Sequence, residues 1–548
     1  MKKDLRVVPT LKKLLPWLWL AGCFIVLVAY LDRNLPHLLD SDLSSELLMA
    51  REIVESGRFV FAPTWIYSTQ IKVLETQLVY ALLFRLTDNW HLIHVLASVI
   101  SYVIMLACYY YFCVQMDMKK AFPLTAGCLM LPFSECYFFY VLRGVYYIPY
   151  ISASFMLFAL TIKSARDRSP AAMLWLALLS LVTGMSGLRQ MLVFSIPMTL
   201  AALVMLYLSV RDRLPQLSET IRLKELKSYW AANVNLRLFL ISAGSAVAVM
   251  AGIVINSKVL AAAYQYRSYG TIMKWTTPNA YRVELAVDSF LFSLGFRDDR
   301  PMLSGAAICN AIVAIVILIL IVCSIRVLRR FKTEAFERTA VVMFNLFGAL
   351  AIGAVAVFST MSYFNHYPLP VVVFALPIIA IYLSELRLSP RWVSAYRAVL
   401  CAMCLLMGVR CYAFYVYEDN RNAREQQVIA EFLTDNGYSG GYAGFWNGNV
   451  LTDMSNGALD IWVLDPTADD LSEIYLWLQS RSHIDTHPEG KIFFVTNYAE
   501  QESMPTLKYL AEDHIIFDTE HFLVYGYGSY DELPEEMRIH RVAESVPE

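Results

Sequence analysis

Charged residues are scarce in this sequence. Of its 548 residues only 17% are charged and 57% are hydrophobic, whereas soluble proteins carry about 25% charged residues. The formal net charge of −2 provides no basic surplus of the kind that binds nucleic acid. This composition excludes an ordinary soluble domain and predicts a polytopic membrane protein.

Cysteine is missing from the C-terminal part of the chain. All ten cysteines lie between Cys23 and Cys411, inside or beside apolar segments. If the C-terminal part faces an oxidising compartment, it is therefore not built on disulfides. The sequence also lacks a Walker loop, a zinc-ligand spacing, a Ser-His-Asp signature, a dinucleotide fingerprint and internal repeats.

Long apolar runs are abundant. A membrane-spanning helix needs roughly 20 apolar residues, and about eleven segments qualify. They are 14–30, 92–114, 121–139, 147–162, 171–186, 190–210, 238–256, 304–325, 339–359, 368–385 and 394–414. The first run follows a lysine-rich start but lacks a small-x-small cleavage site, so we expect an uncleaved first span.

The basic residues between these runs predict the orientation. Placing the N-terminus in the cytoplasm also puts nearly every Lys and Arg cluster there, as the positive-inside rule requires. Loop 31–75, loop 257–303 and the C-terminal part then lie outside the cell. From about Asp419 the charge rises and the apolar runs shorten to strand length, with one predicted helix at 422–436.

Short β-like runs in the C-terminal part are Gly441–Phe445, Ile461–Leu464, Lys491–Thr496, His514–Phe517 and Phe522–Tyr527, with helical patterns at 468–480 and 505–511. The predicted fold class is therefore mostly α: a polytopic transmembrane helix bundle (1–418) followed by an extracytoplasmic α/β domain (419–548).

Two carboxylates stand one residue apart in loop 31–75. Asp40-Ser41-Asp42 precedes an amphipathic run that ends at Gly57, which predicts a helix on the bilayer surface with Asp42 as its N-cap. In the simplest interpretation Asp42 caps this helix and Asp40 is a solvated loop residue. In the alternative, the helix dipole keeps both side chains ionised, and the pair binds a divalent cation or accepts a proton from a hydroxyl.

Two arginines are predicted on the same outer side. Arg189 follows the small residues Ser186 and Gly187, and Arg143 is flanked by aromatic residues. A guanidinium suits a phosphate bidentately, although each arginine can also snorkel or pair with a carboxylate. Further polar and aromatic candidates for substrate contact are Glu46, Tyr67, Gln70, Glu75, Gln190 and His366, for which interfacial anchoring or capping is the alternative.

This layout resembles the polyprenyl-phosphate-dependent GT-C glycosyltransferases, which include protein O-mannosyltransferases and aminoarabinose transferases. The resemblance rests on the multi-span bundle, on Asp40-Ser41-Asp42 in the first outer loop and on the soluble domain after the last span. The stretches 40–46, 67–77, 187–190 and 446–451 also resemble bacterial multi-pass proteins of cell-surface glycan assembly.

The resemblance implies an inverting glycosyltransferase in a bacterial plasma membrane. Its donor is a sugar on a polyprenyl phosphate and its acceptor is a glycan or lipid outside the cell. Asp40 is the expected base, with Asp42 as the alternative, or the two hold Mg²⁺ or Mn²⁺. Arg189, supported by Arg143, is expected to neutralise the leaving phosphate.

Three other functions compete with this one. A transporter or flippase would show ionisable residues within the spans, and little beyond Glu135 near a span end fits. An O-antigen-type polymerase or ligase would use the arginines of loop 257–303. A non-catalytic scaffold or sensor would bind a ligand through its C-terminal part.

Overall fold

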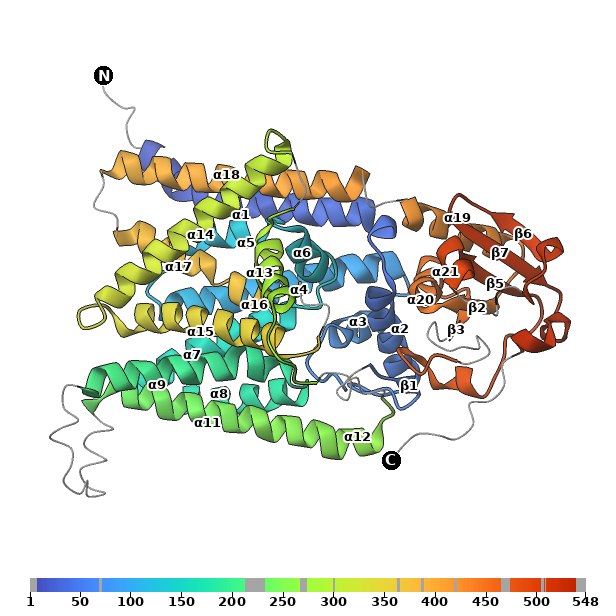
Figure 1. Cartoon of the computed structure of the whole chain (residues 1–548), viewed down its shortest axis with the longest axis horizontal. Helices are drawn as coiled ribbons and strands as arrows, with labels where there is room; N and C mark the ends of the chain where they lie inside the picture. Colours follow the sequence, from blue (N-terminus) through green and yellow to red (C-terminus); the bar gives the residue numbers. More distant parts are fainter. Residues whose placement is uncertain are drawn as a thin grey trace.

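The molecule consists of a long helical bundle with a small sheet region at one end (Figure 1). This computed structural model describes residues 7–68, 71–211, 232–266, 274–298, 301–361, 365–385, 389–417, 421–464, 474–503, 507 and 509–538. The chain is mostly helical, and residues 421–538 form what we call the sheet region.

Eight helices of the described residues are long and apolar enough to cross a membrane, which defines a membrane protein. They contain α1 (Val7–Asn34), α4 (Trp90–Gln115), α7 (Ile148–Asp167), α9 (Ile196–Val210), α11 (Val234–Ile255), α14 (Gly305–Arg329), α15 (Phe336–Phe358) and α18 (Pro390–Tyr417).

The prediction of about eleven spans is therefore too high. The run 121–139 divides into α5 (Phe122–Leu129), α6 (Glu135–Tyr137) and the π-helical η2 (Phe138–Arg143), with Pro132 in the break. The run 171–186 forms only the short α8 (Pro170–Met185), and 368–385 forms α16 (Leu369–Val372) and α17 (Ala375–Glu385). Proline lacks the backbone donor of a continuous helix, so apolar length alone overestimates these spans.

Two glycines allow a close contact between helices α8 and α11. A Cβ on Gly184 of α8 would lie 2.1 Å from the Val249 carbonyl oxygen of α11. A Cβ on Gly252 of α11 would lie 2.1 Å from the Leu181 carbonyl oxygen of α8. Small residues let two helix backbones approach in this way, as is common in membrane bundles.

Loop 31–75 folds between the bundle and the sheet region. Its helix α2 (Ser41–Glu55) packs against α3 (Gln77–Phe84) on one side and against α20 (Phe445–Met454) of the sheet region on another. Helix α2 is thus largely buried between protein elements, and its predicted place at the bilayer surface stays a prediction. Strand β1 (Trp65–Ile66) also pairs with β4 (Gln479–Ser480).

The sheet has five strands in the order β3-β2-β5-β7-β6. They are β2 (Gly440–Gly444), β3 (Asp460–Leu464), β5 (Ile492–Asn497), β6 (Ile515–Asp518) and β7 (Phe522–Tyr527). Strand β2 runs parallel to both β3 and β5, whereas β7 is antiparallel to β5 and β6. The five predicted strands are confirmed to within one residue at each end.

Alternation along the strands gives the sheet two buried faces. One face, including Ala443 and Val495, packs with Leu433 of α19 (Arg421–Asp435) and Leu451 of α20. The other face includes Tyr442 and Phe494. Helix α19 matches the predicted helix, whereas α20 and α21 (Tyr498–Ser503) were not predicted.

The predicted helix at 468–480 lies partly outside the described residues, and its described end is strand β4. The predicted helix at 505–511 also lies partly outside the described residues.

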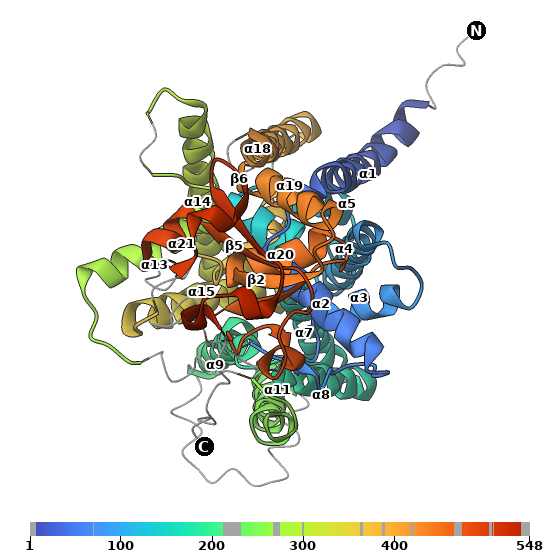
Figure 2. The ribbon, with the colours of Figure 1, turned by 90° about the vertical axis from the view of Figure 1, so that its right-hand side faces the viewer.

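The sheet region and loop 31–75 share one end of the bundle. Viewed along the bundle, the sheet region covers the middle of this end, with α1, α14 and α18 around it (Figure 2). The predicted orientation places loop 31–75 and the C-terminal part on the same side of the membrane, so it requires that they share one end of the bundle. Which side of the membrane this end faces stays a prediction.

Candidate functional site

Asp40 is the N-cap of α2. Its backbone is extended, and its Oδ1 accepts a hydrogen bond of 2.8 Å from the Leu43 amide. Asp42 lies in the first turn of the helix instead. The prediction that Asp42 is the cap and Asp40 has no structural duty is therefore wrong. An Asp at either position is compatible with a helix start, and contacts made elsewhere in the chain select Asp40.

Those contacts come from Arg143 and Tyr146. The Arg143 guanidinium forms an ion pair with Asp40 Oδ2, and the Tyr146 hydroxyl donates a hydrogen bond of 2.7 Å to Oδ1. Between the two residues, Val145 adopts a φ of 50°, which a β-branched residue rarely adopts. The chain thus turns sharply after η2, and the side chains on both sides of the turn contact the same carboxylate.

Two further acidic side chains, Glu46 and Asp42, lie near Lys72. Its Nζ lies 2.5 Å from Glu46 Oε1, and Glu46 is 3% exposed. Burial raises the pKa of Asp42; nearby Lys72 opposes this shift and Glu46 adds to it. The second oxygen of Glu46, Oε2, is buried and has no hydrogen-bond partner among the described residues. We call Asp40, Asp42 and Glu46 the acidic corner.

Glu75 borders the acidic corner. The Tyr150 hydroxyl of α7 donates a hydrogen bond to its Oε1. Burial raises the pKa of Glu75 to about 7, even though Lys72, the Tyr150 hydroxyl and Arg189 favour the ionised form. A carboxyl group with such a pKa can exchange a proton near neutral pH.

Arg189 lies among three tyrosine rings. Its guanidinium carbon is 4.8 Å from the ring centres of Tyr147 and Tyr150 and 5.5 Å from that of Tyr367. We call these four residues the Arg189 cage. The buried Tyr147 hydroxyl and the buried Gln190 Oε1 have no hydrogen-bond partner in the described part of the chain. A cation held by π-faces keeps its N–H donors available for an anion.

His366 packs against this cage. Its ring centre lies 5.4 Å from that of Tyr147 and 4.6 Å from that of Tyr140. Burial and the charge of Arg189 lower the pKa of His366 to about 3. His366 is therefore neutral at physiological pH, where it can contact a substrate but cannot supply a positive charge.

Two further residues were predicted for this site, Tyr67 and Gln70. The Tyr67 hydroxyl is engaged locally, because it accepts a hydrogen bond of 2.9 Å from the Ala62 amide. Gln70 lies outside the described residues. Of the arginines in loop 257–303, Arg282 donates to the Met361 carbonyl and Arg297 pairs with Glu135. Arg267 and Arg300 lie outside the described residues.

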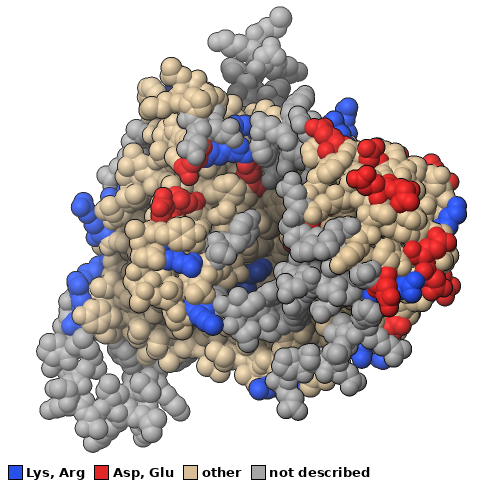
Figure 3. All heavy atoms as spheres, turned by 45° about the vertical axis from the view of Figure 1, so that its right-hand side comes forward, with Lys and Arg blue, Asp and Glu red and all other residues tan. Residues whose placement is uncertain are grey.

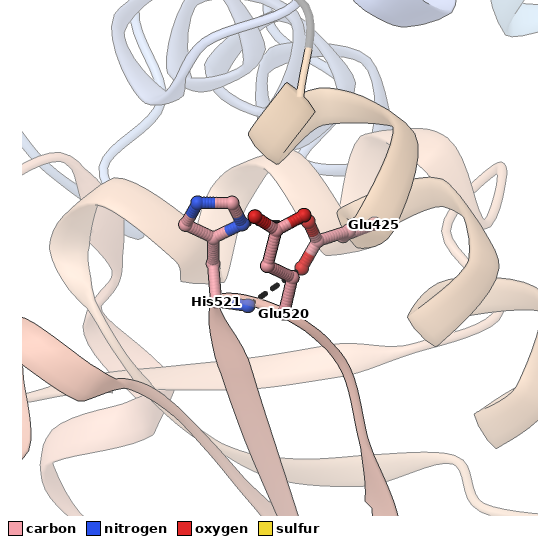
Figure 4. A group of neighbouring side chains, drawn as sticks. All are labelled: Glu425, Glu520 and His521. Atoms are coloured by element: carbon pink, nitrogen blue, oxygen red, sulfur yellow. Dashed lines mark hydrogen bonds and ion pairs between the residues drawn. The ribbon is translucent and has the colours of Figure 1, made fainter.

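A group of residues that could bind a metal ion lies in the sheet region and not at Asp40 and Asp42. Among the described residues, this group consists of Glu425, Glu520 and His521, whose ligand atoms lie within 4.8 Å of one another (Figure 4). Glu425 already accepts a hydrogen bond of 2.7 Å from the His521 ring. The described residues place no comparable trio at Asp40 and Asp42, so a metal at that pair stays a prediction.

A cavity lies beside the segment that carries Arg143. It has a volume of about 380 Å³ and is lined by residues that include Glu135, Asp288, Arg297 and Asn365. Asn365 directly precedes His366 of the site. The space-filling view shows the molecule hollowed between the bundle and the sheet region (Figure 3).

The sequence did not single out three tyrosines that complete the site: Tyr146, Tyr147 and Tyr150. A series of tyrosines is ordinary at a membrane interface, so only their partners distinguish them. No protein-family model matches the chain, and a search of curated proteins finds no similar sequence. Only the residues of the site therefore indicate a function.

Proposed function

We propose that this protein is a membrane glycosyltransferase that moves a sugar from a polyprenyl phosphate to a glycan or lipid acceptor. The observation that carries the proposal is the close set of carboxylates and arginines where α2 meets the bundle: the acidic corner, Glu75, Arg143 and the Arg189 cage. The expected acceptor side is the end of the bundle that carries the sheet region.

The reaction needs a base and an anion site. An acceptor hydroxyl attacks the anomeric carbon, its proton passes to a carboxylate, and the bond from that carbon to the phosphate oxygen breaks with inversion. The phosphate leaves with the bonding electron pair. The Arg189 cage supports the anion role, because its guanidinium is held by aromatic faces rather than by a hydrogen-bonded carboxylate of the described residues.

The base is assigned to Asp42 in preference to Asp40. Three donors hold the Asp40 carboxylate, from Leu43, Arg143 and Tyr146, and donors that stabilise an anion weaken it as a base. Asp42 instead has a raised pKa because it is buried near Glu46. Asp40 becomes a positioning residue, which holds Arg143 until the donor phosphate competes for that guanidinium.

The test measures sugar transfer by membranes that contain the full-length protein. Asp42→Asn should abolish transfer and Asp40→Asn should reduce it severely, with membrane levels unchanged. Asp32→Asn is the matched control, because Asp32 is an exposed aspartate near the end of α1 that pairs with His91. Full activity in both test variants would refute the proposal and favour an O-antigen-type polymerase or ligase, or a lipid-linked glycan transporter.

A further inference from the structure

The sheet region has a reversal of strand order at its centre. The chain runs through β2, crosses by α20 to β3 on one side of β2, and later adds β5 on the other side. All three strands are parallel, so their carboxyl ends lie at one edge. In open sheets with helical crossovers, the crevice at such a reversal is where ligands bind.

Polar groups meet at the carboxyl ends of β2 and β5. Asn447 of α20 follows β2, and its Nδ2 lies 3.3 Å from Oε1 of Glu500, which follows β5. The Asn497 amide donates a hydrogen bond of 2.9 Å to Glu500 Oε2. Gln426 of α19 donates a hydrogen bond of 2.9 Å to Asn447 Oδ1. The amide and the carboxylate are thus fixed in place by groups around them.

The backbone of β2 approaches this carboxylate closely. A Cβ at Gly444, the last residue of β2, would lie 2.5 Å from Glu500 Oε1. Any larger residue at this position would displace the Glu500 side chain. Burial also raises the pKa of Glu500, against the effect of the Asn497 amide.

Large aromatic side chains are exposed beside these polar groups. Trp446 immediately precedes Asn447 and is 61% exposed, and Tyr498 immediately follows β5 and is 43% exposed. An exposed Trp beside a fixed carboxylate and amide suits a carbohydrate. Its ring accepts the apolar face of a sugar, while the Glu500 carboxylate accepts hydrogen bonds from the hydroxyl groups. Asn447 is 2% exposed and holds that carboxylate in place.

The carboxyl end of β2 also lies next to the acidic corner. The Ser41 hydroxyl, one residue after Asp40, donates a hydrogen bond to the carbonyl of Phe445. Phe445 in turn directly precedes Trp446. A ligand at the β2 and β5 ends is therefore within a short chain distance of the carboxylates of α2.

We propose that Trp446, Tyr498 and Glu500, with Asn447 holding the Glu500 carboxylate, form a carbohydrate-binding subsite at the carboxyl ends of β2 and β5, and that this subsite holds the acceptor glycan. Its acceptor role rests on the proposed transferase function, whereas carbohydrate binding itself does not. The sheet region then selects the acceptor, and the bundle supplies the anion site for the donor.

The test measures binding to the full-length protein in lipid nanodiscs. The probe is the mixture of oligosaccharides released by mild acid from the surface polymer of the host cell and labelled with a fluorophore at the reducing end. Removing one aromatic contact in Trp446→Ala should weaken binding about tenfold, and Glu500→Gln should also weaken it. Trp275→Ala is the control and should bind as the wild type does, because Trp275 is an 85% exposed tryptophan of the bundle.

Two results would overturn the proposal: no binding by the wild type at millimolar oligosaccharide, or equal binding by the wild type, Trp446→Ala and Glu500→Gln. Asp42→Asn distinguishes the two proposals. If that variant both binds and transfers normally while Trp446→Ala loses binding, the carbohydrate subsite stands and the proposed transferase mechanism fails.

Discussion

Asp453 joins the sheet region to the helix that carries the acidic corner. It lies in α20 and is 4% exposed, and its Oδ2 accepts a hydrogen bond of 2.8 Å from the Ser44 hydroxyl of α2. The same oxygen lies 2.9 Å from His94 Nε2 of α4. The Tyr80 hydroxyl of α3 lies 3.2 Å from the other ring nitrogen of His94. Three helices, α2, α4 and α20, therefore meet at one buried carboxylate, and α3 joins them through His94.

The substitution Asp453→Ala should release the sheet region from α2. It removes the acceptor for two buried groups, Ser44 and His94, and leaving one buried polar group unsatisfied costs about 1–3 kcal/mol. The docked state should therefore lose about 2–6 kcal/mol. Asp453→Asn keeps one acceptor oxygen and the side-chain volume, so its cost should be smaller, about 1–2 kcal/mol.

Hydrogen exchange of the full-length protein in nanodiscs measures this loss locally. A loss of 2 kcal/mol or more should speed exchange of the α20 amides by about 30-fold or more. Asp435→Ala is the control, since Asp435 is an exposed aspartate at the end of α19. Exchange in Asp453→Ala within threefold of the wild type would refute the view that this carboxylate holds the two parts together.

Three further predictions concern the bundle and the site. Because the pKa of Glu75 is raised to about 7, the folded state keeps a proton that the unfolded state releases above pH 4.5. Stability should therefore fall by roughly 3 kcal/mol between about pH 4.5 and 7, and the thermal unfolding of Glu75→Gln should show a flatter pH dependence than that of the wild type. Gly184→Ala should destabilise the protein by about 1–3 kcal/mol, because its Cβ would meet the α11 backbone. Gly244→Ala on α11, where a Cβ meets nothing within 4 Å, should not destabilise it in the same thermal assay. Arg189→Ala should raise the donor KM at least tenfold, and Arg189→Lys should restore only part of the affinity, since an ammonium lacks the planar fork; an unchanged donor KM in both variants would argue against the anion site.

The sequence predicted local structure well where a short local pattern determines it. The strands of the sheet region follow from short continuous apolar runs such as Ile492, Phe493 and Phe494 between turn residues. The predicted number of spans was too high because the hydropathy of an apolar run does not show where its helix breaks. Pro132 interrupts one apolar run and Pro370 lies in another, and the fragments still bury apolar surface against the bundle.

The site was predicted residue by residue but not as a set of pairs. Asp40, Arg143, Arg189 and Glu75 were each singled out, yet Asp40 and Arg143 are 103 positions apart. No periodicity links positions at that separation, so their ion pair is visible only after folding. The same limit explains why Asp42 was predicted as the N-cap of α2 instead of Asp40. Both residues suit a helix start, and the residue that caps the helix is the one that also contacts Arg143 and Tyr146.

Helix α2 shows how one short stretch performs several tasks. Residues three and four apart share a helix face, so Ser41, Ser44 and Ser45 form one stripe. All three form hydrogen bonds with α20: Ser41 and Ser44 donate to it, and Ser45 accepts from Asn449. Asp42 and Glu46, four apart, form a neighbouring stripe that faces Lys72. Any displacement of the sheet region that pulls on the serine stripe must also rotate or shift the carboxylates, because both belong to the same rigid turns. If a glycan that binds beside Trp446 displaces α20, the hydrogen bonds between α20 and α2 therefore transmit this displacement directly to the acidic corner.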